Sequence, residues 1–129
     1  MSKSLDPRKA SGYITKAENS LKMAKIALEK GAFDNAVMSS VHSSINALDA
    51  LTTSQLGKRS SGQHPDILSL VKGVLTPEEH DVISKQFSNL LGMKNESEYQ
   101  PDLMSQKEAE NAIKWAERIL KLVQSKLKL

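Results

Sequence analysis

Apolar residues recur at alternating spacings of four and three through most of this chain, the spacing that places side chains on one face of an α-helix. The first such stripe contains Ala10, Ile14, Ala17, Leu21, Ala24 and Leu28. Similar stripes occupy residues 37–51, 67–71, 82–91 and 112–127. No segment shows a convincing β-strand pattern. The pattern therefore predicts five helices and no strand.

Residues with known preferences for helix ends place the boundaries of these segments. Asp6-Pro7 and His64-Pro65-Asp66 are typical helix starts. Thr76-Pro77-Glu78-Glu79 and Ser105-Gln106-Lys107-Glu108 have the form of capping boxes. Lys30-Gly31 is a typical helix end, with a cation and a glycine at the C-terminus. These signals agree with the apolar stripes and strengthen the helix assignment.

The polar stretches between the stripes predict the connections. Residues 58–63 and 92–104 are expected to be loops. Only a very short turn separates the first two helices, so these should lie antiparallel. We predict one domain over residues 1–129, all-α, folded as an antiparallel up-and-down bundle of four to five helices.

Composition and charge narrow the class of protein. Aromatic residues make up only 4% of the chain and cysteine is absent, so the core must be aliphatic, and disulfides and cysteine chemistry are excluded. A net charge of +3 permits an RNA or nucleotide partner, and it equally fits surface lysines that keep the protein soluble. No apolar run reaches the length of a membrane span, and the start of the chain lacks the apolar core of a signal peptide. We therefore expect a cytoplasmic protein without a membrane partner.

The sequence has no Gly-rich phosphate loop, no metal-ligating pair at helical spacing and no nucleophile elbow. We therefore predict no metal and no cofactor. One candidate site is a polar row on the second helix, where His42, Asn46 and Asp49 follow at i, i+4 and i+7. This row either lines a groove or is a solvated helix face. Small residues on the same helix would let another helix approach closely, within the chain or between subunits: Ala36, Ser40, Ser43, Ser44 and Ala47.

Two further places carry candidate side chains. Lys94 follows Phe87 by seven residues and Leu90 by four, so it prolongs their inward-facing stripe. Its ammonium either reaches outward to water or meets an anion in a crevice. His64 precedes a helix start, where it either caps the helix or stands at an anion site. His80, among acidic residues, is most simply a surface residue.

Four segments in this order resemble the HEPN family, named for nucleotide binding in higher eukaryotes and prokaryotes. The opening helix is similar around Tyr13-Ile14-Thr15-Lys16-Ala17-Glu18. Gly31-Ala32-Phe33-Asp34-Asn35-Ala36-Val37 looks like the family's turn into its second helix. Gln63-His64-Pro65-Asp66-Ile67-Leu68-Ser69-Leu70 is similar to its Thr-His-x-Gly-Leu-Ile segment. The stretch from Lys94 to Asp102 looks like its Arg-Asn-x-Ala-x-Tyr-x-Pro signature.

The resemblance implies a helical bundle that usually forms a homodimer. Many members of the family are paired with a minimal nucleotidyltransferase in a two-component system, often of toxin–antitoxin type. The catalytic branch consists of metal-independent ribonucleases with an Arg, four to six intervening residues and a His, and RNA lies in the groove between subunits. Here Lys94 stands in place of the Arg, Asn95 matches the polar position after it, and Tyr99 stands in place of the His.

These departures weaken the case for an enzyme. Lysine can hold a phosphate without arginine's two-pronged geometry, but a tyrosine side chain, with a reference pKa near 10, is a poor general base at neutral pH. The sequence favours a non-catalytic HEPN protein that binds a nucleotide, RNA or a nucleotidyltransferase partner near Lys94, Asn95 and Tyr99. The alternatives are a ribonuclease that combines Lys94 with His42 or His64, and a structural adaptor that binds only protein.

Overall fold

The computed structural model describes residues 2–4, 6–60 and 65–127, and this part of the chain is mainly helical. The five helices are α1 (Ala10–Glu29), α2 (Phe33–Leu56), α3 (Pro65–Val71), α4 (Pro77–Tyr99) and α5 (Gln106–Leu127). A 3-10 turn, η1 (Pro7–Lys9), precedes α1, and two short strands are β1 (Ser2–Ser4) and β2 (Lys58–Ser60). No helix in the described ranges is long and apolar enough to cross a membrane.

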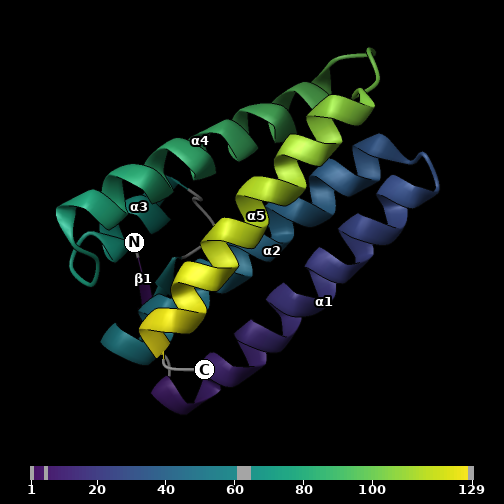
Figure 1. Ribbon diagram of the computed structural model, residues 1–129. Helices are drawn as coiled ribbons and strands as arrows, with labels where there is room; N and C mark the ends of the chain where they lie inside the picture. The colour runs from purple at the N-terminus through teal and green to yellow at the C-terminus, as the bar shows by residue number, and fades with distance from the viewer. Residues whose placement is uncertain (1, 5, 61–64, 128–129) are drawn as a thin grey trace.

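The four long helices run alternately up and down (Figure 1). Gly31, with φ of +76°, forms the tight turn that reverses the chain between α1 and α2. The end of α5 reaches the start of α4, where the Lys126 ammonium lies 2.9 Å from the Glu79 carboxylate. Along α1, Glu18 accepts a hydrogen bond from Gln124 at 3.1 Å. The predicted antiparallel up-and-down bundle is therefore confirmed.

Helix α2 lies at the centre of the bundle and contacts each of the other four helices. The five small residues singled out on it are fully buried inside the chain: Ala36, Ser40, Ser43, Ser44 and Ala47. The hydroxyl of Ser43 donates a hydrogen bond to the carbonyl of Ala17 at 2.7 Å, so α1 and α2 approach closely. The sequence left open whether this small-residue face packs within the chain or between subunits, and the structure shows it packed within the chain. The face is therefore not available as a subunit contact.

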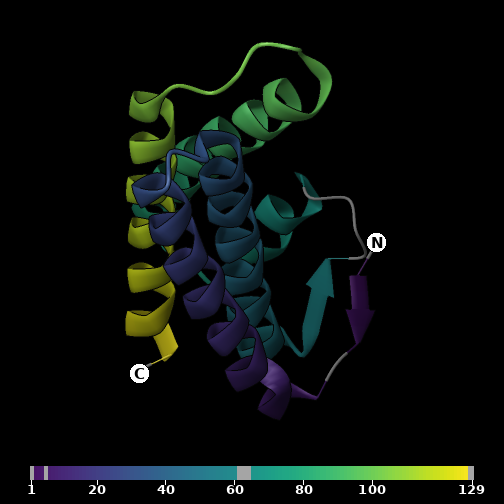
Figure 2. The same ribbon diagram turned by 90° about the vertical axis from the view of Figure 1, so that its right-hand side faces the viewer.

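The expectation of no strand was wrong, as was the expectation of a loop from residue 58. β1 and β2 form a two-stranded antiparallel ladder in which Ser2 pairs with Ser60 and Ser4 with Lys58. Figure 2 shows this ladder beside the helices, next to the C-terminal end of α2. Strands of three residues are too short to show alternation, and their pairing joins segments far apart in the chain.

The boundary predicted at Gly92 was also wrong, because α4 continues to Tyr99. Gly92 does not adopt a positive φ, and a Cβ built on it would meet no atom within 4 Å. Lys94 and Glu98 then form an ion pair across one helical turn, which supports the helix. The connection to α5 is correspondingly shorter, and the residues around the HEPN-like signature lie mostly on a helix.

The helix caps agree with the sequence prediction, whereas the environments of Val82 and His80 differ from it. Both capping boxes are present, with Thr76 Oγ1 accepting from the Glu79 N–H and Ser105 Oγ accepting from the Glu108 N–H. Val82 was expected in the buried stripe of α4 but is half exposed. His80 is not a free surface residue, because its Nε2 lies 2.9 Å from the carbonyl of Leu68 and links α4 to α3.

Candidate functional site

The three residues predicted from the HEPN-like signature lie on the last two turns of α4. Asn95 and Tyr99 are one helical turn apart and exposed, and 75% of the Tyr99 surface is accessible. Lys94 is about 100° around the helix from Asn95, toward the buried stripe. Its side chain is only 21% exposed. The sequence therefore placed Lys94 correctly on the inward side of the helix.

The ammonium of Lys94 is occupied by a carboxylate of the same helix. It donates to Glu98 Oε2 at 3.1 Å. Tyr99 makes no hydrogen bond within the described part of the chain. The cation is thus already paired, and the tyrosine hydroxyl has no hydrogen-bond partner in this part of the chain.

The surroundings of this helix end are acidic. A shallow hollow of about 320 Å³ lies between the last turns of α4 and the start of α5. It is lined by Glu96, Gln100, Asp102, Leu103, Met104 and Glu108. Carboxylates at this density repel a phosphate, because like charges a few ångströms apart interact unfavourably. The end of α4 is therefore poorly suited to hold an RNA backbone.

The polar row of α2 does not form one continuous surface. His42 is exposed, and Asn46 Nδ2 donates to the His42 carbonyl at 2.9 Å within the helix. Asp49, by contrast, is only 6% exposed and lies beneath β2. The predicted shared face exists, but it passes from solvent into the interior. His64, the remaining predicted residue, falls outside the described ranges.

The environment of Asp49 changes its chemistry. Burial raises the pKa of its carboxyl to about 6, against the smaller opposing effects of the Arg59 guanidinium and the Ser60 backbone N–H. Asp49 Oδ1 and the Thr53 hydroxyl, one turn further along α2, are buried without a hydrogen-bond partner among the described residues. Arg59 also donates to the Ser60 carbonyl at 2.9 Å. Asp49 therefore helps to hold β2 on the bundle.

The predicted residues do not converge on one site in a single chain. Ser97 Oγ donates to Asp34 Oδ1 at 3.3 Å, which places the end of α4 beside the start of α2. From Asp34, His42 and Asp49 lie about 12 and about 22 Å further along the helix axis at the usual rise per residue. Within the described ranges, no group of three or more acidic or histidine side chains is placed to hold a metal ion.

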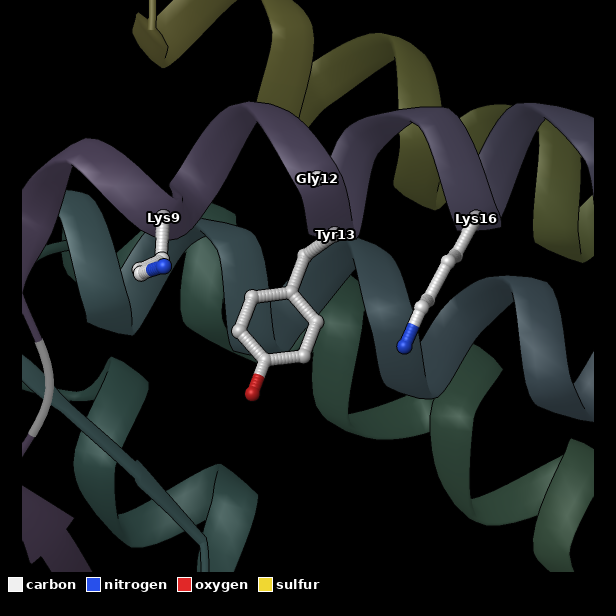
Figure 3. Close-up of a pocket in the computed structure, with 4 residues that line it drawn as sticks. All are labelled: Lys9, Gly12, Tyr13 and Lys16. Atoms are coloured by element: carbon white, nitrogen blue, oxygen red, sulfur yellow. The ribbon is translucent and has the colours of Figure 1, made fainter.

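A second hollow was not foreseen from the sequence. It measures about 260 Å³ and is lined by Lys9, Gly12, Tyr13 and Lys16, at the start of α1. Figure 3 shows the three side chains on the same side of α1, with the Tyr13 ring between the two lysines. The spacing of lysines four residues before and three residues after an aromatic ring was the available signal, since these positions share a helix face.

Comparison with known proteins assigns this chain to a family. The HEPN domain family matches this chain over residues 10–126. The chain belongs to the HEPN family. Among solved structures, TT1696 from Thermus thermophilus is similar in fold to this HEPN protein, with a TM-score of 0.75. The two are 22% identical, and the similarity covers 92% of this chain and 98% of that one. A comparison with curated proteins finds no significant match.

Proposed function

We propose that this HEPN protein acts by binding a nucleotide or RNA and does not cut RNA. The observation that carries the proposal is the ion pair of Lys94 with Glu98 at the position of the family's ribonuclease motif. A cation that steadies a phosphate must have its charge available. Here the charge is already balanced within the helix.

The second motif position leads to the same conclusion. Cleavage without a metal requires a group that takes a proton from the 2′-hydroxyl of RNA. Histidine suits this role at neutral pH, whereas a tyrosine side chain would need its pKa lowered by about three pH units, equivalent to about 4 kcal/mol. The exposed side chain of Tyr99 has no hydrogen-bond partner within the described ranges to provide this. Solvent-exposed charge pairs contribute about 1 kcal/mol or less.

A second candidate function is binding to a protein, such as a nucleotidyltransferase in a toxin–antitoxin-type pair. The specific observation in its favour is the exposure of two large apolar side chains, Tyr99 at the end of α4 and Leu103 four residues later, which are 75% and 83% accessible. Isolated apolar residues on a surface need no explanation, whereas a contiguous apolar patch marks a contact surface, and we propose that these two side chains contribute to one such patch. The same surface is our proposed contact between two copies of the chain in a homodimer.

The test of the main proposal is an RNA-cleavage assay with the purified chain in the presence of a chelator. We expect no cleavage at neutral pH by the native protein. The assay includes Lys94→Ala, Tyr99→Phe, His42→Ala and His64→Ala variants. Cleavage by the native chain that is lost in both Lys94→Ala and Tyr99→Phe would overturn the proposal. Cleavage that is lost in Lys94→Ala and in either histidine variant would favour the alternative ribonuclease, in which His42 or His64 acts with Lys94.

Binding is tested separately from cleavage. We expect weak, mainly electrostatic affinity for RNA, because the net charge is only +3 and aromatic side chains are few. The affinity should fall steeply as salt is added. Tight binding that is insensitive to salt would contradict an electrostatic mode.

A further inference from the structure

The hollow at the start of α1 combines an aromatic ring with two ammonium groups. The ammonium of Lys16 lies 5.9 Å from the centre of the Tyr13 ring, within the range of a cation–π contact. Lys9 lies on the other side of the ring, four residues earlier (Figure 3). Tyr13 is partly buried against the core, so its ring is held in place and only part of it faces the hollow.

Gly12 is part of this hollow and is unusual for its position. It lies within α1 and does not have a positive φ, so the helix does not require a glycine there. A Cβ built on it would meet no atom within 4 Å. Glycine inside a helix is less stable than alanine, and neither the backbone nor the packing explains it here. What Gly12 does provide is open space beside the Tyr13 ring.

The charges around the hollow are positive. Within the described ranges, neither Lys9 nor Lys16 forms a salt bridge, whereas Lys25, on the opposite flank of α1, is paired with Glu117. The acidic groups nearest in sequence are Glu18, which accepts a hydrogen bond from Gln124 on α5, and Asp6, which is paired with Arg8 at 2.7 Å. An anion that enters the hollow therefore meets two available cations and no lining carboxylate.

We propose that this hollow binds one nucleotide, with its base stacked on Tyr13 and its phosphate on Lys9 or Lys16. This rests on the proposed nucleotide- or RNA-binding function and moves its site from the end of α4 to α1. The lining side chains favour this ligand class, because a base can stack on the Tyr13 ring and a phosphate can pair with a lysine ammonium. The volume of about 260 Å³ is slightly below the range of about 300–1,000 Å³ typical of pockets for drug-sized ligands, so the hollow takes at most one nucleotide unit, and part of that unit stays in solvent.

Two sources can supply such a nucleotide, a free mononucleotide or one unit of a single strand. Lys9 and Lys16 are seven residues apart, about 10 Å along the helix. In a strand, one phosphate on each side of the stacked base could be contacted at this separation. A strand that binds more tightly than AMP would assign the site to RNA, and equal affinity would assign it to the free nucleotide.

The experiment is a titration of the full-length, ¹⁵N-labelled chain with AMP, adenosine, inorganic phosphate and a short oligoadenylate, followed by NMR. We expect shifts centred on residues 9–16, and tighter binding of AMP than of either adenosine or phosphate. Tyr13→Ala should weaken binding about tenfold to a hundredfold. Tyr13→Phe should bind nearly as well as the native chain, because it keeps the ring.

Other variants separate the site from the stability of the fold. Gly12→Leu should fill the hollow and abolish binding while the melting temperature stays equal or rises, since leucine favours the helix. Lys16→Gln and Lys9→Gln should weaken binding and reduce its dependence on salt. Lys22→Gln, an exposed lysine elsewhere on α1, is the matched control and should bind as the native chain does.

The outcomes distinguish this inference from the function on which it rests. Binding that persists in both Gly12→Leu and Tyr13→Ala would overturn the site but leave nucleotide binding intact. Absence of any shift at millimolar AMP or oligoadenylate would overturn the inference and favour a protein partner. RNA cleavage in the chelator assay would overturn the non-catalytic proposal, whatever the α1 variants show.

Discussion

The carboxylate of Asp34, in the first turn of α2, accepts a hydrogen bond from the backbone N–H of Met104 at 2.9 Å. The same oxygen accepts from the Ser97 hydroxyl. One side chain thus fixes both the end of α4 and the connection to α5. Met104 itself is buried. These two hydrogen bonds hold the acidic end of α4 against the start of α2.

Asp34→Ala should therefore destabilise the chain by about 1–2 kcal/mol, because it leaves the Met104 N–H without its acceptor. Chemical denaturation measures the change. Asp34→Asn is the matched control, since it keeps an oxygen acceptor and loses only the charge, and should cost less. Equal losses in the two variants would show that the negative charge at the start of α2 matters more than the hydrogen bonds.

The helices could be predicted from the sequence because each one carries its own periodic stripe and local capping residues. Thr76 and Ser105 are clear examples, since a capping box lies within four consecutive residues. The ladder of β1 and β2 could not, because it depends on a pairing between distant segments. The end of α4 was misplaced because Gly92 was read as a helix breaker, while the Lys94–Glu98 pair continues the helix.

The candidate site was less predictable than the fold. Helical spacing placed Asp49 with His42 and Asn46 correctly, but spacing carries no information about β2, whose Arg59 and Ser60 lie against the buried Asp49 carboxyl. The sequence left open whether the Lys94 ammonium reaches water or meets an anion, and its pairing with Glu98 follows from the continuation of α4, which the assignment of these residues to a connection had missed. The role proposed for Tyr13 depends on the open space beside Gly12; the spacing of Lys9 and Lys16 around the ring can be read from the sequence, but that space cannot.

The close packing of α1 on α2 gives a second prediction. Ser43 is fully buried against Ala17, so Ser43→Leu should overpack this contact and destabilise the chain by about 1–3 kcal/mol. Asn35→Leu, at an exposed position of the same helix, is the control and should change stability little. A Ser43→Leu chain as stable as the native one would contradict this close packing of α1 on α2.

The proposed homodimer predicts a sedimenting species of twice the chain mass at micromolar concentration. Leu103 is the most exposed of the large apolar side chains identified, at 83% accessible, and Leu103→Glu should shift the protein toward the monomer. Met23→Glu, which also places a charge on an exposed apolar position, is the control and should leave the dimer intact. A native chain that sediments as a monomer would contradict the proposal.

The raised pKa of Asp49 predicts that stability falls as pH rises. Its carboxyl has a pKa of about 6 in the folded chain, against an ordinary value of 3.8 for an aspartate exposed to water. Below pH 3.8 the carboxyl is protonated in both the folded and the unfolded chain, so its full contribution to the free energy of unfolding is present. Between these values the unfolded chain releases the proton first, so stability declines and then levels off above pH 6. The difference between the two pKa values corresponds to about 3 kcal/mol in the free energy of unfolding.

Asp49→Asn tests this directly, because the amide keeps an acceptor for the Ser60 N–H and adds a donor that can reach the unpartnered Thr53 hydroxyl. The variant should be more stable than the native chain by about 2–3 kcal/mol at pH 7.5, and the gap should nearly close at pH 4. Urea denaturation of both proteins from about pH 4 to 8 measures the gap, and subtraction cancels other carboxyls such as Glu79, whose pKa is lowered by the Thr76 backbone N–H. A constant gap across this range would show that Asp49 is ionised throughout. In that case its contacts with Arg59 and Ser60 outweigh its burial.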